Sequence, residues 1–145
     1  MEPHVILIDR REQRPLTLPN AEAATLATGD YSIRTETVDY RDRIAVERKN
    51  LSDLLGVIGG GRERFERELE RLALMPYPSI VVEASLADVI AGPQHTRIHP
   101  SSVLGSIVAW SVRYRLPIWF VDDHYTAGLI VQKILAKAAK YIQER

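Results

Sequence analysis

The chain has 145 residues, of which 46% are hydrophobic and 26% charged, as expected for one globular domain with a real core. It contains no cysteine, which excludes a disulfide framework and a thiolate metal site. Basic and acidic residues both number 19, so the net charge is zero, and this argues against a protein that coats nucleic acid through a broad basic surface. The start, MEPHVILIDR, is not typical of a signal peptide, and no apolar run could span a bilayer. We therefore expect a cytoplasmic protein without a membrane partner.

The first third of the chain predicts mostly strands. Residues 4–9 form a buried apolar run that ends at Asp9, and a polar loop with two prolines follows it. Residues 21–28 are rich in alanine and predict a short helical turn. Residues 31–38 and 41–48 then predict two antiparallel strands joined around positions 39–42.

From Leu51 onwards the apolar residues recur with a helical period, and the sequence predicts alternating helices and strands. Asn50 or Ser52 is the expected cap of the first helix, and Ser101 or Ser102 that of a later one. Expected helices cover 51–58, 62–75, 86–92, 102–114 and about 126–144, and expected buried strands cover 78–84 and 116–123. The second of these helices should bury Phe65, Leu69 and Leu72 on one side, and Leu74 is a further candidate for that side.

Near-continuous apolar strands that alternate with helices indicate a sheet covered on both faces. The sequence therefore predicts an α/β protein with three layers, α/β/α, and a central mixed sheet. It shows no internal repeat and no low-complexity segment, so we expect one domain over residues 1–145.

The strand at 41–48 ends in the charged triplet Glu47, Arg48 and Lys49. Side chains alternate along a strand, so Glu47 and Lys49 should share one face while Arg48 points to the other. Lys49 is the only lysine among the first 132 residues of a chain with fifteen arginines. This bias indicates a position that requires a compact ammonium group.

Two further carboxylates belong to the same end of the predicted sheet. Asp30 precedes the first hairpin strand, and Asp9 ends the first strand of the chain. Together with Glu47 they offer hard oxygen ligands of the kind that suit Mg²⁺ or Mn²⁺. A metal held in this way can activate a water for phosphodiester hydrolysis, and Lys49 beside it can orient that water or stabilise developing charge. A Glu-x-Lys triplet alone, however, is more often a surface ion pair.

These residues occur in an order that resembles the nuclease domain of the XPF/Mus-type structure-specific endonucleases. The family signature ERK-x-x-x-D is matched by Glu47, Arg48, Lys49 and Asp53. The upstream GD is matched by Gly29 and Asp30, D-x-R-E by Asp9, Arg11 and Glu12, and the later GR pair by Gly61 and Arg62. The resemblance covers about residues 5–83 and implies a restriction-endonuclease-like fold of the PD-(D/E)XK type.

The resemblance also implies roles. Asp9, Asp30 and Glu47 would be metal ligands, with the Arg48 carbonyl as a further ligand, and Lys49 the catalytic lysine. Arg11 and Glu12 would complete the acidic site, Asp53 would support it, and Arg62 would face DNA phosphates. Members of the family usually carry helix-hairpin-helix modules, often beside a helicase, and residues 1–145 contain neither, so we expect junction selectivity to come from a partner or from dimer geometry.

Several other patterns carry two interpretations. Gly59 to Gly61 could contact phosphate, a function that Arg62 and Arg64 favour, or simply interrupt a helix. His95 and His99 have the i,i+4 spacing of zinc ligands on a helix, but the flanking prolines argue against a helix there. Asp122 and Asp123 lie at the end of a predicted strand, where active-site carboxylates also occur, but helix capping is the commoner role of such residues.

The hydrophobic C-terminal third is explained mainly by core packing. Its largest apolar residues are Trp110, Trp119, Phe120, Ile130, Ile134 and Leu135. By analogy with the family, this region also offers the best surface for a homodimer or heterodimer.

The leading hypothesis is a Mg²⁺- or Mn²⁺-dependent endodeoxyribonuclease that cuts branched or junction DNA in repair or recombination. One rival is an inactive DNA-binding or dimerisation subunit, against which the intact Asp30, Glu47 and Lys49 argue. Another is a hydrolase of small phosphoesters, for which no nucleotide-pocket motif is present.

Overall fold

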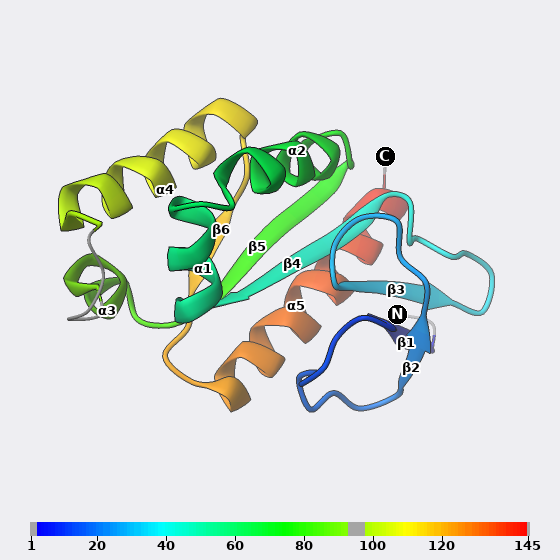
Figure 1. The fold of residues 1–145 in the computed structure, drawn as a ribbon. Coiled ribbons are helices and arrows are strands. Elements are labelled where there is room, and N and C mark those ends of the chain that lie inside the picture. The colour runs from blue at the N-terminus through cyan, green and yellow to red at the C-terminus, as the bar shows by residue number, and fades with distance from the viewer. Residues whose placement is uncertain (1–2, 93–97, 145) are drawn as a thin grey trace.

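A mixed sheet of six strands with helices on both faces organises the chain (Figure 1). The computed structural model describes residues 3–92 and 98–144. The strands are β1 (His4–Asp9), β2 (Ala21–Ala24), β3 (Tyr31–Thr35), β4 (Ile44–Asn50), β5 (Tyr77–Glu83) and β6 (Ile118–Phe120). The helices are α1 (Leu51–Ile58), α2 (Arg62–Ala73), α3 (Leu86–Ala91), α4 (Pro100–Tyr114) and α5 (His124–Gln143). The expected α/β class and mixed sheet are confirmed.

The strand order is β2-β1-β3-β4-β5-β6. Strand β3 is antiparallel to both β1 and β4, whereas β4, β5 and β6 are parallel to one another and β2 is parallel to β1. It follows that β1 and β4 run in the same direction and that their C-terminal ends lie at the edge where β3 begins. The expected antiparallel hairpin of β3 and β4 is confirmed.

Two apolar clusters lie on opposite sides of this sheet. On one side, Ala45, Ile80 and Val82 pack with residues of α1, α2 and α4, including Phe65 and Trp110, which meet edge to face at 5.2 Å. On the other side, residues including Val46, Val81 and Leu135 pack the sheet against α5. Neighbouring residues of one strand thus belong to different cores, as strand alternation requires.

The expectation of a helical turn at 21–28 is wrong, because residues 21–24 form strand β2. Its residues pair in register with β1, from Ile6 opposite Ala21 to Asp9 opposite Ala24. Alanine has the highest helix propensity, but differences in propensity are small in energy, and a strand edge that offers backbone hydrogen bonds overrides them.

The predicted helix boundaries hold best where capping is local. The Asn50 side chain accepts a hydrogen bond from the Asp53 N–H at 2.8 Å and so begins α1. The glycine run separates α1 from α2, which confirms the helix interruption. The predicted caps Ser101 and Ser102 are wrong, because His99 is the N-cap of α4 and Pro100 occupies its first turn.

Two side chains predicted to be buried are exposed. Leu74 lies beyond the end of α2 and is 85% exposed. Trp119 is 47% exposed because β6 is a short strand at the edge of the sheet. The strand expected over 116–123 is confirmed only at 118–120, where it is partly exposed, although Leu116 and Val121 beside it are buried. Asp123 does cap α5, as predicted, by accepting from the Thr126 N–H at 2.7 Å. Across the described residues, none of the helices has both the length and the apolar character needed to cross a membrane.

Candidate active site

Three of the predicted acidic residues meet at one end of the sheet. Asp9 ends β1, Asp30 directly precedes β3, and Glu47 is the central residue of β4. Because β3 runs against both neighbours, its beginning lies beside the C-terminal end of β1 and the middle of β4. Backbone hydrogen bonds fix this arrangement, since the Asp9 N–H donates to the Asp30 carbonyl and the Asp30 N–H donates to the Val46 carbonyl.

Gly29 allows Asp30 to reach this position. Its φ is +79°, a conformation that other L-residues seldom adopt, and a Cβ here would lie 2.9 Å from the Cβ of Ala45. The tight turn brings Asp30 against β4, where its Oδ2 accepts the Arg48 N–H at 2.8 Å. The turn therefore requires glycine at position 29, and the contact with β4 requires a side chain at position 30 that accepts a hydrogen bond.

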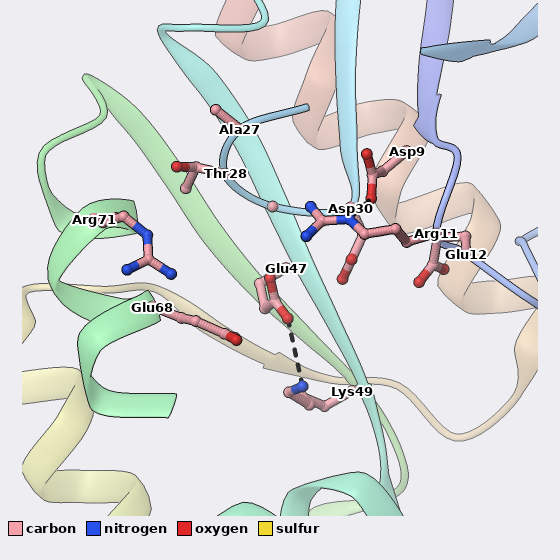
Figure 2. Close-up of a pocket in the computed structure, with 11 residues that line it drawn as sticks. Asp9, Arg11, Glu12, Ala27, Thr28, Asp30, Glu47, Lys49, Glu68 and Arg71 are labelled. Atoms are coloured by element: carbon pink, nitrogen blue, oxygen red, sulfur yellow. Dashed lines mark hydrogen bonds and ion pairs between the residues drawn. The ribbon is translucent and has the colours of Figure 1, made fainter. Parts of the chain in front are cut away.

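The predicted alternation at the end of β4 is confirmed. Glu47 and Lys49 point into a pocket beneath α2, and the Lys49 Nζ lies 3.5 Å from the Glu47 carboxylate (Figure 2). Both side chains are about one-seventh exposed, and the ammonium also lies 4.9 Å from the centre of the Phe65 ring. Lys49 is therefore held on two sides before any ligand enters.

The pocket has a volume of about 240 Å³ and brings most of the predicted residues together. Its lining includes Asp9, Arg11, Glu12, Asp30, Glu47, Lys49, Glu68 and Arg71. Sequence reasoning missed Glu68 and Arg71, which enter from α2 opposite the sheet (Figure 2). Their i,i+3 spacing beside the buried Leu69 and Leu72 places them on one side of the helix. Only the packing of α2 over β4 shows which site that side faces.

Burial of Asp30 and Glu47 makes their ionisation costly. Burial raises the pKa of Glu47 to about 8, and the negative charges of Asp30 and Glu68 add to the effect. Burial likewise raises the pKa of Asp30 to about 6, and Glu12 contributes in the same direction. Lys49 offsets only part of this in both cases. The site therefore has a deficit of positive charge at the point where these two carboxylates meet.

Asp9 differs from these two carboxylates because it is already compensated. Burial opposes its ionisation, but the Leu26 N–H at 3.0 Å and the Arg11 guanidinium at 2.6 Å outweigh it and lower the pKa of Asp9. The Arg11 side chain itself is 75% exposed. Arg11 thus covers Asp9 from the solvent side of the pocket.

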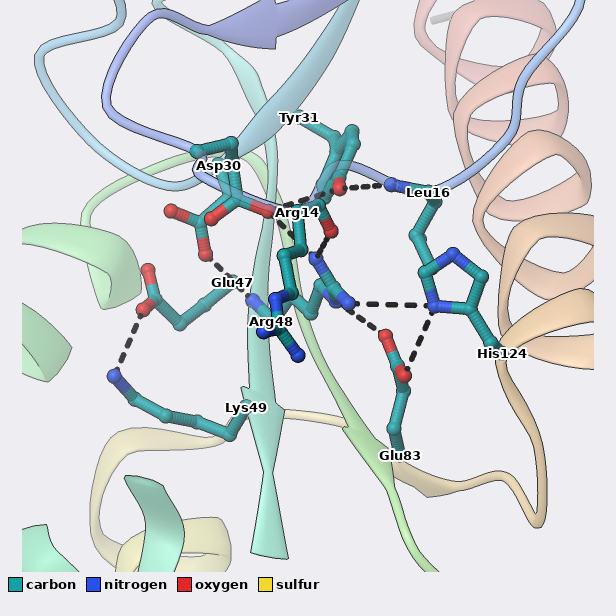
Figure 3. Close-up of polar contacts among 10 residues, drawn as sticks. Arg14, Leu16, Asp30, Tyr31, Glu47, Arg48, Lys49, Glu83 and His124 are labelled. Carbon is teal, nitrogen blue, oxygen red and sulfur yellow. Dashed lines mark hydrogen bonds and ion pairs between the residues drawn. The ribbon is translucent and has the colours of Figure 1, made fainter. Parts of the chain in front are cut away.

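Arg48 projects from the opposite face of β4 into a polar network (Figure 3). Its guanidinium pairs with Glu83 of β5 and lies 3.0 Å from Glu12, and both carboxylates raise the pKa of Arg48 although burial opposes them. His124, at the start of α5, places its Nδ1 3.2 Å from the Glu83 carboxylate. The Arg48 network ties the loop that follows β1 to β5 and α5.

Glu12 takes part in both the pocket and the Arg48 network. It lines the pocket, yet its Oε2 accepts hydrogen bonds from the Tyr31 hydroxyl at 2.9 Å and from Arg48. The same Tyr31 hydroxyl accepts the Leu16 N–H at 2.9 Å. Glu12 therefore has its partners fixed, and it orients the loop more than it contributes free charge.

The remaining predicted residues lie outside the pocket. Arg62 stacks on Trp110 at 5.1 Å, pairs with Glu66 and donates to Ser106 at 2.7 Å, so α4 occupies it. Arg64 and Asp53 line a neighbouring hollow between α1 and α2 that also contains Lys49. Of the histidine pair, His99 caps α4, and His95 lies outside the described residues.

The acidic cluster fits a hard divalent cation in donor type and in charge. It supplies carboxylate oxygens, and the raised pKa values of Asp30 and Glu47 show that a positive charge would be favourable between them. Within residues 3–92 and 98–144, however, no three histidine, aspartate or glutamate side chains are already arranged to hold a metal ion. The reason is visible at Asp9, whose carboxylate is bound by Arg11 and Leu26.

Comparison with known proteins agrees with this geometry. The model of the ERCC4 domain matches residues 8–134. Among solved structures, XPF from Aeropyrum pernix has a TM-score of 0.71 and 22% identity over 92% of this chain and 60% of that one. A second structure, XPF from Aeropyrum pernix in complex with DNA, has a TM-score of 0.72 and 22% identity over 95% of this chain and 66% of that one. Comparison with curated protein sequences gave no match.

The two structural likenesses show a shared fold, and the chain spans less than two-thirds of the XPF chains that it matches. The family match extends over most of the chain and includes every residue of the acidic pocket, from Asp9 on β1 to Arg71 on α2. The chain therefore belongs to the ERCC4-domain family.

Proposed function

We propose that the protein is a Mg²⁺- or Mn²⁺-dependent endodeoxyribonuclease that hydrolyses phosphodiester bonds in branched or junction DNA, in repair or recombination. The observation that carries the proposal is the pocket in which Asp30, Glu47 and Lys49 meet. Membership of the ERCC4 family and the DNA complex of the XPF neighbour support DNA as the substrate.

The residues that would hold the cation are Asp30 and Glu47, with Asp9 joining them once Arg11 moves aside. The cation would supply Lewis acidity and an activated water. Lys49 has the other role: its ammonium, already placed between Glu47 and Phe65, is positioned to orient the attacking water or to stabilise charge on the phosphate. Arg11, released from Asp9, would be available to a phosphate oxygen.

The side chains around the pocket are held in place, which favours a catalytic role for Glu47 and Lys49 over that of a surface ion pair. Asp30 is held by the Arg48 N–H, and the strand that bears Glu47 and Lys49 is anchored by the Arg48 network on its other face. Residues held in this way keep their positions when a ligand enters, which lowers the cost of reaching the reactive geometry.

The test is a panel of labelled flap, fork, nicked and duplex DNAs incubated with Mn²⁺. We expect the wild type to cut a junction substrate, and Lys49→Ala or Asp30→Asn to lose at least about a thousandfold in rate while DNA affinity and the circular dichroism spectrum are retained. Lys133→Ala removes an exposed lysine from α5 and serves as the matched control. Full activity in Lys49→Ala would contradict the proposal.

An inactive DNA-binding or dimerisation subunit is the second candidate. It shares the fold and the family, but it has no use for a buried Glu47 whose pKa is raised to about 8 by burial beside Asp30. Calorimetric titration separates the two, because an inactive subunit shows no Mn²⁺ binding that depends on Glu47.

A homodimer or heterodimer forms part of the same proposal. Apolar side chains are exposed along one side of α4, at Leu104, Val108 and Val112, which follow one another at intervals of four residues. Exposed apolar groups that are gathered in this way mark protein contacts. Sedimentation equilibrium, compared between the wild type and Val112→Glu, measures whether this face associates.

A further inference from the structure

Helix α2 carries a row of charged residues along the side that borders the site. Arg64, Glu68 and Arg71 follow an i,i+4,i+7 pattern and therefore lie on one side of the helix. Glu68 and Arg71 line the pocket of about 240 Å³ that holds Glu47. Arg64 and Glu68 line the neighbouring hollow of about 450 Å³. Because Lys49 lines both spaces, the two arginines lie on either side of it along the helix.

Neither arginine has a partner inside the described part of the chain. Arg11, Arg48 and Arg62 all pair with carboxylates. The side chains of Arg64 and Arg71, by contrast, make no ion pair, hydrogen bond or ring contact within residues 3–92 and 98–144, although Glu68 is on the same side of the helix. Figure 2 shows the Arg71 guanidinium directed towards the pocket. Two unpaired guanidinium groups beside a catalytic lysine indicate an anionic ligand with more than one charge.

The negative charge of the pocket means that further cationic groups are needed to bind a phosphodiester. Its lining carries five carboxylates and three cationic groups, an excess of negative charge that repels a phosphodiester. A divalent cation would offset this excess at Glu47 and Asp30, but the phosphates on either side of the cut bond lie beyond it. Arginine, with its planar set of donors, suits phosphate oxygens at those two positions.

The spacing along the helix matches a nucleic acid strand. Seven residues of α-helix span about 10.5 Å, while one DNA strand advances about 3.4 Å per nucleotide along its axis. The distance from Arg64 to Arg71 therefore corresponds to about three nucleotides, with Lys49 between them. This arrangement fits one phosphate on each side of the phosphate that reacts.

We infer that Arg64 and Arg71 bind phosphates of the strand that is cut, on opposite sides of the bond at Lys49, so that this strand runs along α2. The inference rests on the proposed function and adds to it the path of the substrate strand. It also makes Arg71 a phosphate-binding residue, the role expected of Arg62 from the sequence. Arg64 and Arg71 are positioning residues, since they hold the strand and leave the chemistry to the pocket.

The experiment measures binding of fluorescein-labelled flap DNA by anisotropy, with Mn²⁺ present and Lys49→Ala as the parent so that the DNA stays intact. Arg64→Ala and Arg71→Ala should each weaken binding about tenfold at low salt. Each should also reduce the slope of log K against log salt by about 0.7–0.9, the value for one phosphate contact. Arg71→Lys keeps the charge and should retain most of the slope.

The matched control is Arg67→Ala. Arg67 is an exposed arginine of the same helix and lines neither the pocket nor the neighbouring hollow. It should bind like the parent, and equal losses in the Arg64, Arg67 and Arg71 variants would overturn the inference, as would unchanged binding in the Arg64 and Arg71 variants. A cleavage assay with Lys49 intact separates the proposed nuclease function from the proposed strand path. If this protein cuts flap DNA while the arginine variants bind normally, only the strand path is wrong. If no DNA is bound by the parent, both are wrong.

Discussion

The two faces of β4 treat charge in opposite ways. On one face Arg48 meets Glu83, Glu12 and His124, and each charge has a close partner of opposite sign or a polar neighbour. On the other face Glu47 meets Asp30 and Glu68, with Lys49 as its nearest cation. Consecutive residues of one strand thus belong to a satisfied network and to a site that lacks positive charge.

The paired face of β4 supports the site on its other face, where charge is costly. Carboxylates that repel one another would move apart if their backbone were free to adjust. The Arg48 side chain anchors β4 to β5 and to the loop after β1, while its N–H holds Asp30 in place. Unfavourable charge on one face is therefore maintained by favourable pairing on the other.

The largest effect is expected from breaking the satisfied face. Arg48→Ala leaves Glu12 and Glu83 without their common cation in a setting where each is less than one-fifth exposed. We expect a loss of about 3–5 kcal/mol in the free energy of unfolding. Urea denaturation followed by circular dichroism measures it, and Arg67→Ala should change stability by less than about 0.5 kcal/mol. A small loss in Arg48→Ala would mean that the network does not anchor the strand.

An effect of the opposite sign is expected on the other face. Glu47→Gln removes a buried carboxyl whose ionisation is unfavourable, so it should stabilise the protein without added metal by up to about 4 kcal/mol near pH 8. The same change should abolish Mn²⁺ binding in calorimetry. A variant that is more stable and does not bind the ion would confirm that the two faces of β4 differ in this way, and a destabilised variant would contradict it.

A smaller effect concerns pH. The pKa of Glu47 is raised above its unfolded value of 4.5 to about 8, so the stability that its bound proton provides is present below pH 4.5 and is lost as pH rises to about 8. Without metal, the wild type should therefore lose stability between pH 6 and pH 8 relative to Glu47→Gln. Added Mn²⁺ should offset this loss, because it replaces the proton. Thermal denaturation of both proteins at three pH values, with and without Mn²⁺, measures this difference. The prediction is wrong if the melting temperatures of the two proteins change with pH in the same way.

Local patterns in the sequence were sufficient to predict much of the site. Alternation placed Glu47 and Lys49 on one face of a strand, the bias against lysine singled out Lys49, and Asn50 was a recognisable helix cap. These features depend on neighbours within a few residues, and that is why a single sequence reveals them.

The remaining parts could not be predicted because they depend on contacts between distant segments. An alanine-rich segment became a strand because β1 offered it an edge, and Arg62 was taken up by Trp110 of α4. Glu68 and Arg71 follow an ordinary amphipathic pattern, which shows that they share a side of α2 but not what that side faces.

By itself, then, the sequence determined which residue types end β4 and how they alternate, since strand geometry sets both over a few positions. The tertiary structure alone brings Arg11 over Asp9, pairs Arg48 with carboxylates of β5 and of the loop after β1, and lines the pocket with residues of α2. The physical reason is that pairing and burial of charge depend on groups brought together by the packing of the sheet, and spacing along the chain does not specify those groups.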